Sequence, residues 1–435
     1  MKIALIGAGS YVFAPGVLQD ALIDHRIDDS DFAMVDLDFR AAERMANLGR
    51  VMAADAGVQA RLSAMTDWRD ALPGADFVIL SAAIQGERRW RMDAEIIGRY
   101  DMPDQMEENG TLAGLSYSLR TITLALALAR DMERLCPQAI LLDVANPMPR
   151  VLTAIKNHTA IRALGFCNAA WGGPNGYRKI GQWAGRDPGD LEIVTAGLNH
   201  FAWLLVVKDR RTGEDLYPVV EKAVREGRGK EYDILRMFLR EYGGIGVSGA
   251  PHMLEWVPCD PALRRTVSPP FHGSAQEREE RFRLIDRVIA GAANWREVVG
   301  PHRSWERPLD AAAALATRAT ARFDMINLPN DGYIPQLPNG RIVETPAIAA
   351  GGGIRGCKVP ALPDGVAAIC RAISDTHEVV ADAAATGDRA KARQAVEMDP
   401  SIPDKPRALR ALDELLAAHA DILPQFAASG GQLAR

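Results

Sequence analysis

A cysteine and a histidine are the side chains of this sequence best suited to bind a metal ion. Cys167 lies in Gly165-Phe166-Cys167-Asn168, shortly after residues 139–147, which read as a buried strand ending in polar, turn-forming residues. His200 lies in the stretch 191–203, which is strand-like up to the polar trio Gly197, Asn199 and His200. A thiolate and an imidazole brought together by the fold would make a soft or borderline metal site. The two lie far apart in the sequence, so a buried inert cysteine and a structural histidine remain the alternatives.

Carboxylates gather in a polar, glycine-bearing loop that precedes an amphipathic helix through residues 122–135. Asp104, Glu107 and Glu108 can simply complement the positive end of that helix. Clustered acids that face a cofactor can instead have a raised pKa and act as a general acid. Their proximity in the sequence leaves both interpretations open.

Three arginines, Arg88, Arg89 and Arg91, follow a predicted buried strand at residues 75–81. A loop leaving the carboxyl edge of such a sheet is well placed to touch a ligand, and guanidinium groups bind anionic substrates through charge-assisted hydrogen bonds. The alternative is that they are solvated or paired with nearby acids, namely Glu87, Asp93 and Glu95.

A glycine turn, Gly7-Ala8-Gly9-Ser10, follows the apolar strand 2–7 and precedes a helix-compatible stretch. Such a turn lets the backbone approach a pyrophosphate, although the third glycine of the usual fingerprint is missing here. Asp36 ends a second predicted strand at 31–36, where a carboxylate favours NAD over NADP. The alternative is a doubly wound sheet that binds nothing.

The elements that must position these side chains alternate between strand and helix in the first half of the chain. Helical spacing at 41–55 and a short strand at 59–62 continue the pattern, which predicts an α/β fold with an N-terminal Rossmann-like doubly wound sheet. The second half predicts an intimately packed C-terminal α+β, largely helical domain; its helices fall at 218–242, 276–323 (two) and 366–426, with a strand at 342–344. We expect an NAD-binding domain at 1–170 and a metal- and substrate-binding domain at 171–435.

Composition narrows the class of protein. The chain has 435 residues, a net charge of −5 and no basic stripe, so nucleic acid is not an expected partner. Five cysteines without a Cys-x-x-Cys pair argue against a disulfide framework or a zinc ribbon. The first residues form no signal peptide and no long uncharged apolar segment stands out, so we expect a cytoplasmic protein without a membrane partner.

Taken together, these motifs resemble glycoside hydrolase family 4, the NAD- and divalent-metal-dependent glycosidases, across nearly the full length. The resemblance implies a fold of the lactate/malate dehydrogenase-like superfamily. The matching stretches, in order, are Gly7–Ser10, Glu108–Gly110 with Leu119-Arg120-Thr121, 137–147, Gly165–Asn168, Gly197–His200, Asn327–Asn330 and Asp399-Pro400.

The resemblance implies a role for each matching residue. Gly7, Gly9, Ser10 and Asp36 would bind NAD, and Cys167 with His200 would bind a divalent metal, commonly Mn²⁺. Asn146 would lie between cofactor and sugar, and Asn168 would contact the substrate. Apart from the resemblance, the charges of Arg88, Arg89 and Arg91 suit contact with an anionic sugar. NAD would take hydride from C3 of the sugar, which acidifies the proton at C2; the aglycone is eliminated, water adds, and the hydride returns. Asp104, Glu107 or Glu108 would protonate the leaving oxygen, and Glu108 is the closest match to a family glutamate.

The sequence departs from the family pattern where the base for C2 should stand, because the best match there is Ala250. His252, Tyr242, Asp260 or a metal-bound hydroxide could replace it, and we expect His252.

We therefore predict an NAD-dependent glycosidase of an anionic sugar: a uronate, sulfoquinovose or a sugar phosphate. The alternatives are an NAD-dependent sugar or hydroxy-acid dehydrogenase and an NAD-binding pseudoenzyme or sensor. The expected partner is a small-molecule glycoside, and we expect a homodimer or homotetramer.

Overall fold

The computed structural model describes the chain except for residues 168, 170–175, 261–262, 264–274, 300–305 and 428–435. One sheet of 12 strands runs through it in the order β3-β2-β1-β4-β5-β6-β10-β11-β7-β8-β9, with β12 paired to β11.

Six parallel strands form the N-terminal part of this sheet. They are β1 (Lys2–Ile6), β2 (Ser30–Val35), β3 (Ala60–Met65), β4 (Phe77–Leu80), β5 (Ile140–Asp143) and β6 (Arg162–Gly165). Their spatial order, 3-2-1-4-5-6, is that of a dinucleotide-binding domain, whose ligand binds at the carboxyl ends of the strands where the order reverses, between β1 and β4. The predicted Rossmann-like sheet is confirmed.

Antiparallel strands continue the sheet beyond β6. They are β7 (Leu191–Leu198), β8 (Phe201–Asp209), β9 (Ile245–Gly246), β10 (Ala321–Pro329), β11 (Ile342–Ala350) and β12 (Gly353–Gly356). Asn327 of β10 pairs with Gly165 of β6, and Glu344 of β11 pairs with Gly197 of β7. These pairings bring the residues around Cys167 and His200 to one region of the sheet.

Helices cover the parallel strands on both faces. They are α1 (Ala14–Gln19), which continues into a π-helical turn η1 (Asp20–Asp24), α2 (Phe39–Ala56), α3 (Trp68–Ala71), α4 (Gly86–Arg99), α5 (Thr111–Leu135) and α6 (Met148–His158). Helix α5 is long and apolar enough to cross a membrane by composition, but 78% of its apolar window is buried. It is packed here as a core helix.

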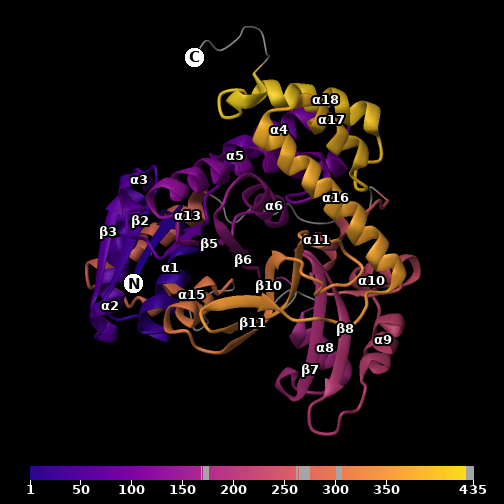
Figure 1. The fold of residues 1–435 in the computed structure, drawn as a ribbon, viewed down its shortest axis with the longest axis horizontal. Coiled ribbons are helices and arrows are strands. Elements are labelled where there is room, and N and C mark those ends of the chain that lie inside the picture. The colour runs from indigo at the N-terminus through magenta and orange to yellow at the C-terminus, as the bar shows by residue number, and fades with distance from the viewer. Residues whose placement is uncertain (168, 170–175, 261–262, 264–274, 300–305, 428–435) are drawn as a thin grey trace.

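The chain's last helices return to the N-terminal half. The helices α16 (Asp364–Thr386), α17 (Arg389–Met398) and α18 (Lys405–Ala418) share one hydrophobic core with α5 and α6. Figure 1 shows α17 and α18, in yellow, stacked over α4 and α5. The remaining helices are α8 (Tyr177–Ala184), α9 (Tyr217–Glu226), α10 (Lys230–Tyr242), α11 (Ala250–Leu254), α13 (Ala275–Ile289), α14 (Arg296–Val299) and α15 (Pro308–Thr317), with 3-10 turns η2 (Pro103–Gln105), η3 (Pro188–Asp190) and η4 (Pro424–Phe426).

The strand predicted up to the polar trio is β7, which ends at Leu198; Asn199 and His200 then turn the chain into β8, and His200 adopts a left-handed φ of 58°. One element prediction was wrong in detail. The predicted helix ending at residue 323 stops at Thr317, since Arg318 takes a left-handed φ of 55° and β10 begins at Ala321.

Candidate functional site

The glycine turn after β1 has the geometry of a dinucleotide-binding turn. Gly7 adopts a left-handed φ of 89°, and a Cβ added there would lie 2.9 Å from the backbone of Ala82 after β4. The backbone N–H of Gly9 donates to Oδ2 of Asp36 at 2.9 Å, and a Cβ at position 9 would come within 2.7 Å of that oxygen. The turn therefore lies between β1 and β4 at the carboxyl edge, and its glycines fit a close backbone approach to a pyrophosphate.

Cys167 and His200 meet although they are far apart in the sequence. Cys167 follows β6, and His200 lies in the turn between β7 and β8. The Sγ of Cys167 is 3.2 Å from Nε2 of His200. A sulfur and an imidazole nitrogen at this separation form a donor pair that can bind a borderline divalent ion such as Zn²⁺. Burial and then the charge of His252 lower the pKa of His200 to about 3, so its imidazole is neutral, as a metal ligand must be.

A buried polar group lies next to Cys167. Oε2 of Glu344 accepts hydrogen bonds from Nδ2 of Asn199 at 3.0 Å and from Nδ2 of Asn327 at 3.1 Å. Burial raises the pKa of Glu344 to about 7. Burial, followed by the charge of Glu344, raises the pKa of the Cys167 thiol to about 12. A metal ion binding there would therefore displace a proton from the thiol.

The loop before α5 is held against His200 by a buried carboxylate. Oε2 of Glu255 accepts from the backbone N–H groups of Asn109 (2.7 Å) and Gly110 (3.3 Å). A Cβ on Gly110 would lie 1.8 Å from the carbonyl oxygen of Glu255, so the two segments pack in direct contact. The amide Nδ2 of Asn109 lies 3.0 Å from Nδ1 of His200.

His252 is the partly exposed member of this cluster. Its Nδ1 is 2.8 Å from the other oxygen of Glu255, and its ring lies 4.2 Å from that of His200, measured between centroids. Its side chain is 34% exposed, whereas that of Glu255 is 2% exposed. Burial alone would lower the pKa of His252, but the hydrogen bond and charge of Glu255 and the charges of Glu108 and Glu107 raise it above its usual value.

Glu108 and Asn146 face each other across the carboxyl edge of the sheet. Nδ2 of Asn146, which follows β5, donates to Oε1 of Glu108 at 3.3 Å. Burial and then the charge of Glu255 raise the pKa of Glu108 to about 7, while the hydrogen bond from Asn146 and the charge of His252 lower it. Glu108 therefore keeps a proton near neutral pH, which suits a general acid.

A second donor set, formed by His200, His252 and Glu255, offers ligand atoms that all lie within 4.8 Å of one another. Both oxygens of Glu255 already accept hydrogen bonds or face His252, so a metal there would have to displace these contacts. At Cys167 and His200 a metal would take the place of the contact between Sγ and Nε2 and would leave the contacts of Glu255 intact, so this pair is the better metal site.

The other predicted substrate and acid residues have these contacts in the described part of the chain. Arg91 is exposed and pairs with Glu87, and Arg88 donates to Gln85. Asp104 lies in η2, where it accepts from Gln105. Asn168 is outside the described residues.

Arg89 and Tyr242, a predicted substrate contact and a candidate base, make structural contacts. Arg89 is buried and pairs with Asp421 near the end of the chain. Tyr242 packs against Trp203 and Phe238, and burial raises its pKa to about 12, far from that of a base at neutral pH. Asp260 lies beyond α11 and is bordered by undescribed residues.

The sequence alone assigned no role to three residues of this cluster, Asn109, Glu255 and Glu344. Two of them carried a usable signal. Glu255 lies three residues after His252 and so on the same side of a helical turn, and Glu344 interrupts an apolar strand. Asn109 carried none beyond its place in the Glu108–Gly110 motif.

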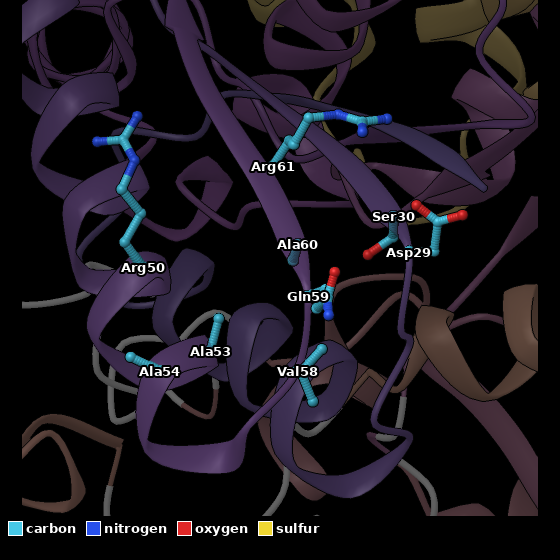
Figure 2. A pocket seen from close by; sticks show the side chains of 9 residues that line it. All are labelled: Asp29, Ser30, Arg50, Ala53, Ala54, Val58, Gln59, Ala60 and Arg61. Carbon is cyan, nitrogen blue, oxygen red and sulfur yellow. The ribbon is translucent and has the colours of Figure 1, made fainter.

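The cavity shown in Figure 2 lies away from the cluster around Cys167 and His200. It has a volume of about 410 Å³ and lies at the amino ends of β2 and β3, among Ser30, Ala60, Arg61 and Arg50 of α2. The glycine turn and Cys167 lie at the carboxyl ends of their strands, which is the opposite edge of the sheet.

Comparison with known proteins places the chain in a family. The model of "Family 4 glycosyl hydrolase" matches residues 2–182, and that of "Family 4 glycosyl hydrolase C-terminal domain" matches residues 195–402. An α-galactosidase from Bacillus subtilis is 28% identical, with 98% of this chain and 99% of that protein covered. An α-galacturonidase from the same organism is 26% identical, covering 92% and 93%.

The fold agrees with this match. A solved 6-phospho-α-glucosidase from gut microorganisms, in complex with NAD and Mn²⁺, superimposes with a TM-score of 0.80 over 97% of this chain and 99% of that one, at 20% identity. The two family models together span most of the sequence, from β1 to the loop after α17. The chain therefore belongs to glycosyl hydrolase family 4 and is a glycoside hydrolase.

Proposed function

We propose that this protein is an NAD- and divalent-metal-dependent glycosidase that cleaves its substrate by transient oxidation at C3, removal of the C2 proton and elimination of the aglycone. The observation that carries the proposal is the 3.2 Å approach of Cys167 Sγ and His200 Nε2 beside Asn146 and Glu108 at the ligand-binding edge of a Rossmann sheet.

The glycine turn is proposed to hold the cofactor, and Cys167 with His200 the metal. Gly7, Gly9 and Ser10 would receive the pyrophosphate, and Asp36 the ribose. When bound, NAD supplies reversible hydride acceptance at C3 and the divalent ion supplies Lewis acidity next to it. Asn146, which follows β5 between β4 and β6, is proposed to lie between the two sites and to orient the sugar.

Glu108 is proposed to be the general acid. Its carboxyl proton passes to the glycosidic oxygen as the bond from C1 to that oxygen breaks, so the aglycone leaves as an alcohol. The electron pair of the former C2–H bond becomes the C1–C2 double bond. The raised pKa of Glu108, about 7, keeps the required proton on the enzyme at neutral pH.

His252 is proposed to accept the C2 proton in place of the missing family base. Glu255 binds Nδ1 of His252, which places the proton of the neutral ring on Nδ1 and leaves Nε2 with its lone pair. A hydrogen at C2 is acidic only while C3 is oxidised, so a base of imidazole strength suffices. Addition of water across the double bond and return of the hydride complete the cycle.

The substrate is proposed to be a glycoside of an anionic sugar: a uronate, sulfoquinovose or a sugar phosphate. By their names, the relatives include enzymes for galacturonides and for phosphorylated glucosides, and also an α-galactosidase for a neutral sugar. A cytoplasmic location and a homodimer or homotetramer stay predictions.

A panel assay tests the proposal. The purified protein is incubated with Mn²⁺ and with aryl uronides, sulfoquinovosides, phosphorylated glycosides and neutral galactosides, each with and without NAD. We expect aryl alcohol to be released only with both NAD and metal, fastest on an anionic glycoside, and without accumulation of NADH. Release that persists after removal of NAD would contradict the mechanism, stoichiometric NADH would indicate a dehydrogenase, and NAD binding without turnover would indicate a pseudoenzyme.

A further inference from the structure

We propose that Asn109 is a positioning residue that sets the tautomer of His200 by turning its side-chain amide when a divalent metal binds. The inference rests on the proposed function, in which Cys167 and His200 are the metal ligands.

The amide of Asn109 is buried, and only its nitrogen has a hydrogen-bond partner among the described residues. Its side chain has no solvent exposure, and Nδ2 lies 3.0 Å from Nδ1 of His200. Its Oδ1 is buried and, among the described residues, has no hydrogen-bond partner. A buried carbonyl oxygen left without a partner is destabilising, which favours a state in which that oxygen accepts a hydrogen bond.

The two tautomers of His200 make opposite demands on Asn109. In the arrangement observed, Nδ1 accepts from Nδ2 of Asn109, so the ring proton must be on Nε2, facing Sγ of Cys167 at 3.2 Å. A nitrogen that carries a proton has no lone pair for a metal. Metal binding at Nε2 therefore requires the proton on Nδ1, which must then find an acceptor.

Rotation of the Asn109 amide by half a turn supplies that acceptor. The oxygen and nitrogen of the amide exchange places with little change in shape, so Oδ1 would accept from Nδ1–H, and Nδ2 would give up its contact with the ring. The surrounding parts stay fixed, because Glu255 holds the backbone N–H of Asn109 and the β7–β8 turn holds His200. An amide can hydrogen-bond to Nδ1 in both tautomers, because it has a donor and an acceptor. A carboxylate can only accept, so it pairs only with the tautomer that carries its proton on Nδ1, and a methyl group pairs with neither.

Calorimetry of Mn²⁺ binding to the full-length metal-free protein, without NAD or substrate, tests the role of Asn109. We expect Asn109→Ala to weaken binding about 10- to 100-fold, as loss of such outer partners does, and Asn109→Asp to bind at least as tightly as wild type. Asn157→Ala, which removes a side-chain hydrogen bond to Glu378 far from the cluster, is the matched control and should change nothing.

Nitrogen NMR of the wild-type protein with labelled histidine provides a readout that does not depend on the variants folding. The chain has 8 histidines, and the spectrum of His200→Ala assigns the signal of His200. We expect the proton on Nε2 without metal and on Nδ1 after addition of diamagnetic Zn²⁺.

Two results would overturn the inference. One is Mn²⁺ binding by Asn109→Ala that matches wild type, and the other is a His200 tautomer that does not change with metal. Failure of the proposed function looks different: wild-type protein would bind no Mn²⁺, or would bind it equally well after Cys167→Ala, and the inference would fall with it.

Discussion

Glu108 holds its proton in a range where most carboxyl groups have lost theirs. Burial and Glu255 raise its pKa to about 7, so the acid form persists through slightly acidic and neutral pH and is lost as the pH rises further. A general acid must be protonated, so the glycosidase rate should fall above about pH 7.

Replacement of Glu108 by Gln tests this assignment. The amide can keep the hydrogen bond to Asn146 but has no acidic proton, so hydrolysis of an alkyl glycoside should fall about 10²- to 10⁴-fold. An aryl glycoside with a good leaving group should suffer much less, and the fall in rate at high pH should disappear. Glu87→Gln on the surface is the control, and an unchanged alkyl-glycoside rate in Glu108→Gln would contradict the role.

Glu255→Gln tests the tautomer of His252. A glutamine oxygen can still accept from the loop N–H groups, but its NH₂ would then face Nδ1 of His252. The ring proton would move to Nε2, and the base would be lost. We expect exchange of the C2 proton to slow by about 10²- to 10⁴-fold with NAD affinity retained, as measured by mass spectrometry of the sugar in heavy water. Exchange at the wild-type rate would exclude His252 as the base.

The sequence predicted which single residues are candidates for the site, but not the hydrogen bonds between them. Cys167, His200, Glu108 and His252 stand out because their side chains do chemistry in polar segments. The hydrogen bonds that orient them join residues far apart in the chain, so Asn109 carried no local signal that would mark it as a partner of His200.

At the scale of elements, the loop that carries Glu108 is fixed by a motif from the other end of the chain. Oγ of Ser401, after α17, accepts from the backbone N–H of Thr111, which begins α5 with a left-handed φ of 61°. Ser401 in turn donates to Asp399, whose other oxygen forms a buried ion pair with Arg150 of α6 at 3.0 Å. The start of α5 is therefore positioned by the segment between α17 and α18.

Ser401→Ala removes the partner of the Thr111 N–H and leaves a buried donor unsatisfied. We expect a loss of about 1–3 kcal/mol in the free energy of unfolding, measured by urea denaturation of the metal-free protein. Thr386→Ala, which removes an exposed hydroxyl at the end of α16, should stay within about 0.5 kcal/mol of wild type. Equal stability of the two variants would contradict the positioning role of Ser401.

The spacing of apolar residues predicted most helices and strands, because it shows which face of each element is buried. The alternation of strands and helices to residue 147 and the breaks at Gly387 and Asp399 appear in the structure as expected. The β7–β8 hairpin was missed because Asn199 and His200 make its turn in place of the glycine-containing pairs that usually mark one.

Across the whole molecule, one sheet and one core join the two halves of the chain. The sheet passes from β6 to β10, and helices α16 to α18 cover apolar faces of α5 and α6. Such pairings between distant segments follow from no local pattern, so the sequence could predict intimate packing but not which strands join.

This arrangement predicts that residues 1–170 alone do not form a stable unit. Without α16 to α18, the apolar faces of α5 and α6 would be open to water, which removes a large share of the hydrophobic stabilisation. The fragment should bind a hydrophobic dye and unfold without a cooperative transition in urea, followed by circular dichroism, whereas the full chain should unfold cooperatively. A sigmoidal transition of the fragment, without dye binding, would contradict this view.

The central claim is that this enzyme cleaves glycosides through a reversible oxidation at C3 that labilises the proton at C2. The most direct measurement is turnover of the best glycoside of the panel in heavy water, with NAD and Mn²⁺, followed by mass spectrometry and NMR of the released sugar. The released sugar should carry one deuterium at C2, and NADH should not accumulate. A product without deuterium at C2 would contradict it.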